Sequence, residues 1–389
     1  MQLAGIGCCS WQSVDGFSLG LTKGRSRSSS GRGCSASSSN FGLGFSGAFG
    51  IGEFRTTWVS GGRGTNSPGV KCSVVEVKAE NRDDIGSIVK ALQSRDRFPK
   101  KWLGQHYMVN EKVNAKVVDA AHICPGDIVV EIGPGTGALT KSLVAAGAHV
   151  IAVEKDPDMA SLVAERFAES GNVDVVNIDF LKWPLRNEIK KYLEKATLAS
   201  GEPKLAKIVS NLPFNITTNV VKKVLPMGDL FSTVVLLLQD EAALRLVDAS
   251  PDSGEYRPIS FVVNFYSVPE YKFKVPRKSF FPVPRVDGGV VCFAIKKESE
   301  YPLVASQKVF FSMINSAFNG KRKMLRNTLQ HMFSPSSTQA ALLSVGLPET
   351  ARPEELTLEQ FVAFYNAVTS MTAPNSLAGP PSVIQPGLN

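Results

Sequence analysis

A glycine-rich loop follows a short apolar run in the middle of the chain. Residues 128–132 are apolar except for Glu131, and residues 133–137 read Gly-Pro-Gly-Thr-Gly. Glycine lets a backbone turn tightly and approach a ligand closely, so Gly133 and Gly135 are candidates for cofactor contacts. Glu154 follows about 20 residues later, where dinucleotide-binding proteins carry the acid that binds ribose hydroxyls. This pattern alone is compatible with an oxidoreductase as well as with a methyltransferase.

Three polar features around the loop favour a methyltransferase that uses S-adenosylmethionine. Glu131 immediately precedes the glycines, where it would repel a pyrophosphate but suit a cofactor that carries an ammonium and a sulfonium. Asp179 ends the third expected strand, and its carboxylate can accept a hydrogen bond from an adenine amine. The tetrapeptide Asn-Leu-Pro-Phe at residues 211–214 follows the fourth expected strand. This ordered set is what we expect of such a methyltransferase.

The tetrapeptide at residues 211–214 suits the methylation of an adenine. The exocyclic amine is a weak nucleophile, because its lone pair is delocalised into the ring, so a site must hold and align it rather than deprotonate it. Asn211 supplies a side-chain carbonyl and Leu212 a backbone carbonyl as acceptors for the amine. Pro213 stiffens the turn, and Phe214 can stack on a base that has left its helix. We assign all four residues to the catalytic site.

Helical and strand-like patterns alternate from about residue 112, which predicts a parallel sheet covered by helices on both faces. Short apolar strands are expected at residues 128–130, 149–154, 173–178, 208–210 and 234–239. Two later strand-like runs, residues 261–268 and 288–295, flank a turn-rich segment and would form an antiparallel edge. The predicted fold class is therefore α/β and Rossmann-like.

Strand patterns stop after about residue 298. Phe310, Met313 and Ile314 have helical spacing, and the leucines and phenylalanines that follow predict a small all-helical domain. We therefore expect a methyltransferase domain at residues 73–297, a helical RNA-binding domain at 298–372 and a disordered tail at 373–389.

Residues 1–72 have the composition of a targeting leader. They are rich in Ser and Gly and contain only two acids, Asp15 and Glu53. Leaders that are hydroxylated, Arg-containing and poor in acids are typical of organelle transit peptides. The excess of Ser and Gly favours the chloroplast stroma, with the mitochondrion as the alternative. A disordered RNA-binding tail is the other interpretation of this segment.

Several classes of protein are excluded by composition. No apolar run approaches the roughly 18 to 20 residues that a membrane span requires, so we expect no membrane partner. The six cysteines form no CxxC pair, and the four histidines are scattered. We therefore expect neither a disulfide framework nor a metal site.

Six motifs resemble, in order, those of the ribosomal RNA adenine dimethyltransferase family, and the likeness spans about residues 98–370. They are Gly-Gln-His-Tyr-Met at 104–108, the glycine loop, Asn-Leu-Pro-Phe-Asn-Ile at 211–216, Gln-Asp-Glu-Ala-Ala-Leu-Arg at 239–245, Phe-Phe-Pro-Val-Pro-Arg-Val-Asp at 280–287 and Lys-Arg-Lys-Met-Leu at 321–325. The resemblance implies a seven-stranded methyltransferase domain, a helical domain and a basic cleft between them. It also implies that two methyl groups are placed on each of two adjacent adenines near the 3′ end of small-subunit rRNA, within an immature particle.

The resemblance also assigns site residues. It places cofactor contacts on His106, Met108, Gly133, Glu154, Asp179 and Asn211. The family usually has Asn where His106 stands, Leu where Met108 stands and Tyr where Phe214 stands; the last change removes a hydroxyl and keeps the stacking face. Phe280 aligns with the aromatic residue beside the target base, although a core position is equally compatible with its strand-rich surroundings.

Basic residues are concentrated late in the chain. Residues 261–333 contain 12 basic and 4 acidic residues, and the densest group is Lys321, Arg322, Lys323 and Arg326. Such a group is often only a solvated face, but beside an adenine-methylating site it predicts contacts to RNA phosphates.

Two other functions compete with that of an enzyme, which we expect to act as a monomer. One is a nucleic-acid-binding assembly or transcription factor that keeps the fold without methylating, and complete cofactor motifs argue against it. The other is a protein-glutamine methyltransferase, whose loop normally carries a second proline where Leu212 stands.

Overall fold

The structure is a computed structural model, and it describes residues 106–372 except 214, 248–249 and 252. The expected transit peptide at residues 1–72, the tail at 373–389 and the side chain of Phe214 lie outside the described residues. The assignments made for them, and the domain boundary near residue 298, stay predictions.

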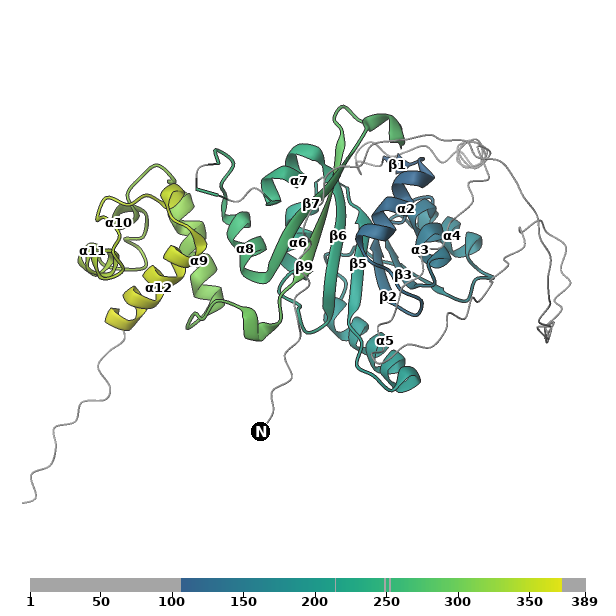
Figure 1. The fold of residues 1–389 in the computed structure, drawn as a ribbon, viewed down its shortest axis with the longest axis horizontal. Helices are drawn as coiled ribbons and strands as arrows, with labels where there is room; N and C mark the ends of the chain where they lie inside the picture. The colour runs from purple at the N-terminus through teal and green to yellow at the C-terminus, as the bar shows by residue number, and fades with distance from the viewer. Residues whose placement is uncertain (1–105, 214, 248–249, 252, 373–389) are drawn as a thin grey trace, which may run out of the picture. The chain divides into compact units, whose positions relative to one another are not determined.

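A seven-stranded sheet forms the centre of the described structure (Figure 1). Its spatial order is β4-β3-β2-β5-β6-β9-β7. The strands are β2 (Ile128–Ile132), β3 (His149–Glu154), β4 (Val173–Asn177), β5 (Ala206–Asn211), β6 (Phe231–Gln239), β7 (Ser267–Val275) and β9 (Gly288–Ile295). β2 to β6 run parallel, whereas β9 lies antiparallel between β6 and β7. The predicted α/β class is confirmed, and so is the antiparallel strand predicted at residues 288–295, although its partner at the edge is β7 and not the run at 261–268.

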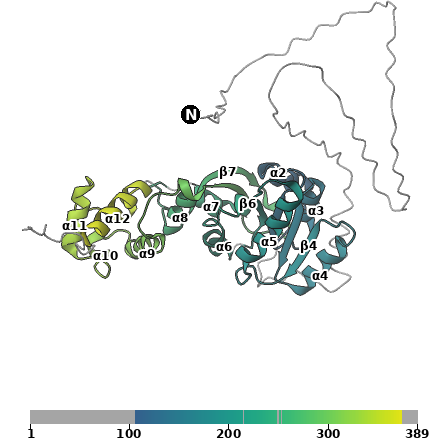
Figure 2. The same ribbon diagram turned by 90° about the horizontal axis from the view of Figure 1, so that it is seen from below.

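Helices cover both faces of this sheet (Figure 2). They are α2 (Glu111–Ala120), α3 (Ala138–Ala145), α4 (Pro157–Arg166), α5 (Leu185–Ser200), α6 (Thr217–Val224), α7 (Asp240–Val247) and α8 (Pro258–Tyr266). Val129 of β2 packs in one apolar cluster with α2 and α3, whereas Ile128 and Val130 pack in another with α5 and α6. Because strand side chains alternate between faces, a strand buried on both faces must be apolar throughout. This requirement explains the apolar run of β2.

A two-stranded ladder joins the beginning of the described chain to the β7–β9 connection. β1 (Tyr107–Met108) pairs antiparallel with β8 (Phe280–Phe281), so that Tyr107 lies opposite Phe281 and Met108 opposite Phe280. Two motifs far apart in the sequence therefore meet at one place.

The run at residues 261–268, predicted as a strand, is mostly helical. α8 begins at Pro258 and ends at Tyr266, and only then does β7 start. Aromatic and β-branched residues favour a strand locally. Here, however, α8 is buried on most sides, and apolar side chains cover most of its circumference. Phe261, for example, packs its ring 5.5 Å from Phe318 and 5.0 Å from Phe361. Tertiary packing therefore overrides the local preference.

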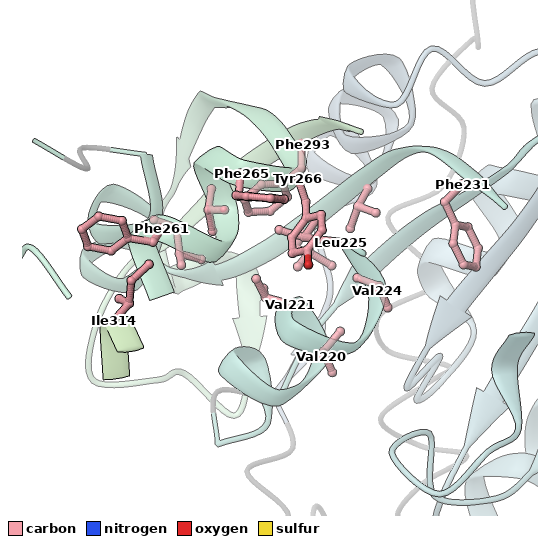
Figure 3. Close-up of a cluster of buried hydrophobic side chains, with 14 of the residues drawn as sticks. Val220, Val221, Val224, Leu225, Phe231, Phe261, Phe265, Tyr266, Phe293 and Ile314 are labelled. Carbon is pink, nitrogen blue, oxygen red and sulfur yellow. The ribbon is translucent and has the colours of Figure 1, made fainter. Parts of the chain in front are cut away.

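The C-terminal region is helical, as predicted. It contains α9 (Gln307–Phe318), α10 (Leu325–Thr328), α11 (Pro335–Ser344) and α12 (Leu358–Thr372). Figure 3 shows Phe261 of α8 beside Ile314 of α9, within an apolar cluster that continues into the sheet. Tyr256 also donates a hydrogen bond to the backbone oxygen of Leu356 at 2.9 Å. The helical region is thus packed against α8.

Within residues 106–372, apart from the gaps named above, no helix is both long and apolar enough to cross a bilayer. The same residues contain no group of three or more His, Cys, Asp or Glu side chains arranged to hold a metal ion.

Candidate active site

The glycine loop leaves the carboxyl end of β2 with its glycines in the left-handed region. Gly133, Gly135 and Gly137 have φ values of 68°, 57° and 78°. Residues with a Cβ rarely adopt such values. A Cβ on Gly135 would lie 2.9 Å from the ring of Tyr107. The loop and β1 therefore fit together only because residue 135 is glycine.

This loop lies where the strand order of the sheet reverses. β2 has β3 on one side and β5 on the other, and it pairs with β5 only at Val129 and Val130. Beyond these pairs, the hydroxyl of Ser210 donates to the backbone oxygen of Ile132 and connects the two strand ends. Open α/β sheets bind ligands in the crevice at such a switch point.

A cavity at this point is lined by every residue that was assigned to the cofactor. They are His106, Met108, Gly133, Gly135, Glu154, Asp179 and Asn211. Leu212 and Pro213 of the catalytic tetrapeptide line it as well. The structure therefore brings together segments that are as far apart in the sequence as His106 and Asn211, which are separated by 105 residues.

Glu154 connects the end of β3 to the glycine loop. Its Oε1 accepts a hydrogen bond from the backbone N–H of Asp156 at 2.9 Å, and its Oε2 accepts one from Gly135 at 3.4 Å. Burial raises the pKa of Glu154, and the backbone hydrogen bonds act in the opposite direction. A carboxyl group held in this way has lone pairs left for the hydroxyls of a ligand.

Glu131 also lines the cavity and is buried. Its residue is 1% exposed, and the hydroxyl of Thr140 donates to its Oε2 at 2.6 Å. The pKa of Glu131 is raised to about 8, mainly by burial and also by the nearby Glu154, whereas the hydrogen bonds from Thr140 act in the opposite direction. A positively charged ligand would favour the ionised form of this carboxyl, as the sequence argument requires.

Asp179 lies just beyond β4 at the cavity wall. Its Oδ2 is 3.0 Å from the ammonium of Lys155, and its Oδ1 accepts from the backbone N–H of Leu181 at 3.0 Å. The hydrogen bond to Lys155 lowers the pKa of Asp179. Asp179 therefore stays ionised near neutral pH and remains an acceptor for an amine.

Lys223, which no sequence pattern indicates as a site residue, holds the turn that follows Asp179. The Lys223 ammonium, on α6, donates to the backbone oxygens of Phe180 at 2.7 Å, Leu181 at 2.9 Å and Trp183 at 2.9 Å. Phe180 also lines the cavity. Nothing in the sequence separates Lys223 from its neighbour Lys222, because only the fold brings the turn to α6.

Lys223→Met should weaken binding of S-adenosylmethionine by roughly 5- to 10-fold, or about 1 to 1.4 kcal/mol, the net value of one typical hydrogen bond, because Lys223 acts on the cofactor only through the turn that it holds. The physical reason is that the turn carrying Asp179 and Phe180 loses its three-way support. Calorimetry on the purified protein would measure the change. Lys222→Met is the matched control, because Lys222 is exposed, and equal dissociation constants for the two variants would contradict this role.

Asn211, the last residue of β5, is oriented by the segment that precedes β1. Its Nδ2 donates to the backbone oxygen of His106 at 3.2 Å. With the amide nitrogen used in this way, the side-chain oxygen is left as an acceptor for a substrate amine. His106 in turn has its Nδ1 2.8 Å from the backbone oxygen of Pro282. His106, Asn211 and Pro282, which come from three of the six motifs, are therefore linked at this point.

Phe280 does not line the cavity. It is 2% exposed and packs in the apolar cluster with Met108 and Val275. The structure thus places Phe280 in the core, the alternative that the sequence left open, and its stacking on a target base stays a prediction.

The late basic group is only partly free. Lys321 lies 3.4 Å from Glu354, so its charge is shared with an acid of the same region. Arg322 and Lys323 are exposed, and Arg326 is partly buried. Their contact with RNA phosphates stays a prediction.

S-adenosylmethionine fits the chemistry of this cavity better than a dinucleotide does. A pyrophosphate would face the carboxyls of Glu131 and Glu154, whereas a sulfonium and an ammonium would be attracted to them. Glu154 would bind the ribose hydroxyls, Asp179 the adenine amine, and the glycine loop would approach the methionine portion closely. The sheet order and this cavity define a Rossmann-fold methyltransferase that depends on S-adenosylmethionine.

Comparison with known proteins narrows this class. The family model for ribosomal RNA adenine dimethylases matches residues 97–370. A protein of Arabidopsis thaliana, called a chloroplastic ribosomal RNA small subunit methyltransferase, is 56% identical over 74% of this chain and 83% of the relative. Ribosomal RNA small subunit methyltransferase A of Protochlamydia amoebophila is 35% identical over 70% of this chain and 92% of the relative. The chain belongs to the ribosomal RNA adenine dimethylase family.

Solved structures agree on the fold. A dimethyladenosine transferase from Plasmodium falciparum has a TM-score of 0.57 and 24% identity, and the match covers 68% of this chain and 98% of that chain. The predicted fold is therefore confirmed, and the family model and the relatives confirm the predicted family and enzyme class. The predicted chloroplast location agrees with the name of the Arabidopsis relative.

Proposed function

We propose that this protein transfers methyl groups from S-adenosylmethionine to the exocyclic amines of two adjacent adenines near the 3′ end of plastid small-subunit rRNA. Two groups are added to each adenine, and the reaction contributes to ribosome biogenesis. The observation that carries the proposal is the hydrogen bond from Asn211 to His106, which leaves an amide oxygen as an acceptor at the wall of the cofactor cavity.

The residues of the chain act mainly by binding and alignment. S-adenosylmethionine supplies an electrophilic methyl group when it is bound. Asn211 Oδ1 and the backbone oxygen of Leu212 accept hydrogen bonds from the adenine amine and direct its lone pair toward that methyl group. As the nitrogen gains positive charge during attack, the same oxygens stabilise it until a proton leaves to solvent. Pro213, whose ring approaches Gly133, keeps this turn against the glycine loop.

The substrate would be held partly by charge. Arg322, Lys323 and Arg326, together with Lys321, would contact RNA phosphates and position a monomeric enzyme on the small subunit, within an immature particle. Such contacts would orient the RNA, whereas RNA shape and the flipped adenine would provide the specificity.

Mapping of dimethyladenine in plastid small-subunit rRNA tests the proposal. In plants that lack this protein, primer extension should lose the two adjacent stops that dimethylated adenines cause. The wild-type gene should restore them, and an Asn211→Ala gene expressed at the same level should not. Stops that persist without the protein would overturn the proposed substrate. Restoration by Asn211→Ala would instead favour an assembly factor that does not methylate.

A further inference from the structure

The connection between β7 and β9, residues 276–287, forms a rim beside the cofactor cavity and is called the rim loop below. It is tied to the residues that line this cavity by the β1–β8 ladder and by the contact of His106 Nδ1 with the backbone oxygen of Pro282 at 2.8 Å. The backbone N–H of Val109 also donates to the oxygen of Ser279 at 2.9 Å. The rim loop therefore has a defined position next to the site of methyl transfer.

One aromatic residue of the rim loop is buried and the next is exposed. Phe280 is 2% exposed and anchors the loop in the core, whereas Phe281 is 38% exposed. Val283 and Val286 are 58% and 44% exposed. Isolated exposed apolar side chains are common, but three within six residues beside a substrate site indicate a binding surface.

The rim loop also carries three cations. Arg277, Lys278 and Arg285 are exposed, and the Arg277 guanidinium donates to the backbone oxygen of Arg285 at 3.3 Å. No acid in the described part of the chain lies within salt-bridge distance of these three cations.

The nearby acids bind other groups, although Asp287, itself part of the rim loop, also accepts a hydrogen bond from the backbone N–H of Arg277 at 2.9 Å. Asp240 binds Lys274 at 2.9 Å, and Asp287 binds the same lysine at 3.3 Å. Glu241 forms an ion pair with Arg245. The rim loop thus presents an excess of positive charge together with an exposed ring.

We infer that the rim loop is a docking surface for the RNA strand that flanks the target adenine. Arg277, Lys278 and Arg285 contact phosphates, and Phe281 stacks on a base next to the flipped one. The inference rests on the proposed function. When an adenine leaves its helix, a neighbouring base loses a stacking partner, and an exposed ring replaces it. The charge pattern favours a polyanion over a neutral or basic partner.

The phosphate contacts are tested with Arg277→Ala/Arg285→Ala. The substrate is small subunits isolated from plants that lack the protein, and binding and methylation are measured over a range of salt concentrations. The double variant should raise the KM for subunits about tenfold and flatten the salt slope by roughly 0.7 to 0.9 per lost contact. The dissociation constant for S-adenosylmethionine should not change. Lys190→Ala/Lys195→Ala, which removes two exposed charges from α5, is the matched control and should behave as wild type.

The stacking contact is tested with Phe281→Leu and Phe281→Tyr. The leucine variant keeps an apolar side chain but loses the flat ring, and it should raise the KM for subunits about tenfold. The KM of the tyrosine variant should stay within twofold of the wild-type value. A purely structural role for this exposed side chain would not predict a difference between the leucine and tyrosine variants. Salt slopes or KM values equal to wild type, or an equal loss in the α5 control, would overturn the inference.

Failure of the proposed function has a different signature. If wild-type protein binds subunits without methylating them, the proposed reaction is wrong, and the binding measurements on the variants still decide the rim loop. If wild-type protein neither binds nor methylates the subunits, both proposals are wrong.

Discussion

Asn211→Ala should lower kcat by roughly 100- to 1,000-fold, the range seen when one preorganised polar contact to a reacting group is removed. The variant loses the oxygen that His106 orients by accepting a hydrogen bond from the amide nitrogen. RNA affinity should remain nearly unchanged, because Asn211 makes no phosphate contact. Single-turnover methylation of small subunits measures the first quantity, and filter binding measures the second.

Two further variants make the Asn211 result specific. Asn219→Ala alters an exposed asparagine on α6 that does not line the cavity, and it should leave kcat at the wild-type value. Asn211→Asp keeps an oxygen but loses the donor to the His106 carbonyl, so it should be nearly as slow as the alanine variant. Parallel losses of kcat and RNA affinity in Asn211→Ala would show that Asn211 binds RNA rather than aligning the amine.

Glu154→Ala should weaken the binding of S-adenosylmethionine by about 1 to 3 kcal/mol, the range for a hydrogen bond that involves a charged group. Two losses contribute. The ribose hydroxyls lose their acceptor, and the backbone N–H groups of Gly135 and Asp156 lose theirs, so the glycine loop is held less firmly. Calorimetry with the purified protein measures this change directly.

Glu154→Gln separates these two losses. The amide keeps one acceptor oxygen, but its NH₂ group must face either a backbone N–H or the ligand, so we expect an affinity between those of wild type and Glu154→Ala. Glu194→Ala, an exposed change on α5, is the control and should bind as wild type does. An unchanged affinity in Glu154→Ala would remove Glu154 from the cofactor site.

Much of the fold follows from local sequence patterns. The strand at residues 149–154 was predicted with the bounds that β3 has in the structure, because both of its faces are buried and an apolar run has few alternatives. The run at residues 261–268 was assigned wrongly as a strand. Its residues are of the types that favour a strand, but Pro258 starts a helix that is apolar on most sides. Only the packing against α9 and α12 distinguishes such a helix from a buried strand.

The sequence by itself determined the class of chemistry. The glycines, the acids at 131, 154 and 179 and the tetrapeptide at 211–214 are side-chain types that a methyl donor and an adenine require, and their order places each at the end of a strand. Parallel strands with regular crossovers bring such ends to one edge of a sheet. The order of these residues along the chain was therefore enough to predict that they come together, and in the structure all seven predicted cofactor residues line one cavity.

Only the tertiary structure decided which contacts support these residues. Three of these contacts join chain segments that are 28 to 105 residues apart. Tyr107 lies against Gly135, Lys223 holds the turn after Asp179, and His106 orients Asn211. It also decided that Phe280 is buried whereas Phe281 faces solvent. Periodicity records which side of its own element a residue occupies, but it contains no information about which distant element will cover that side.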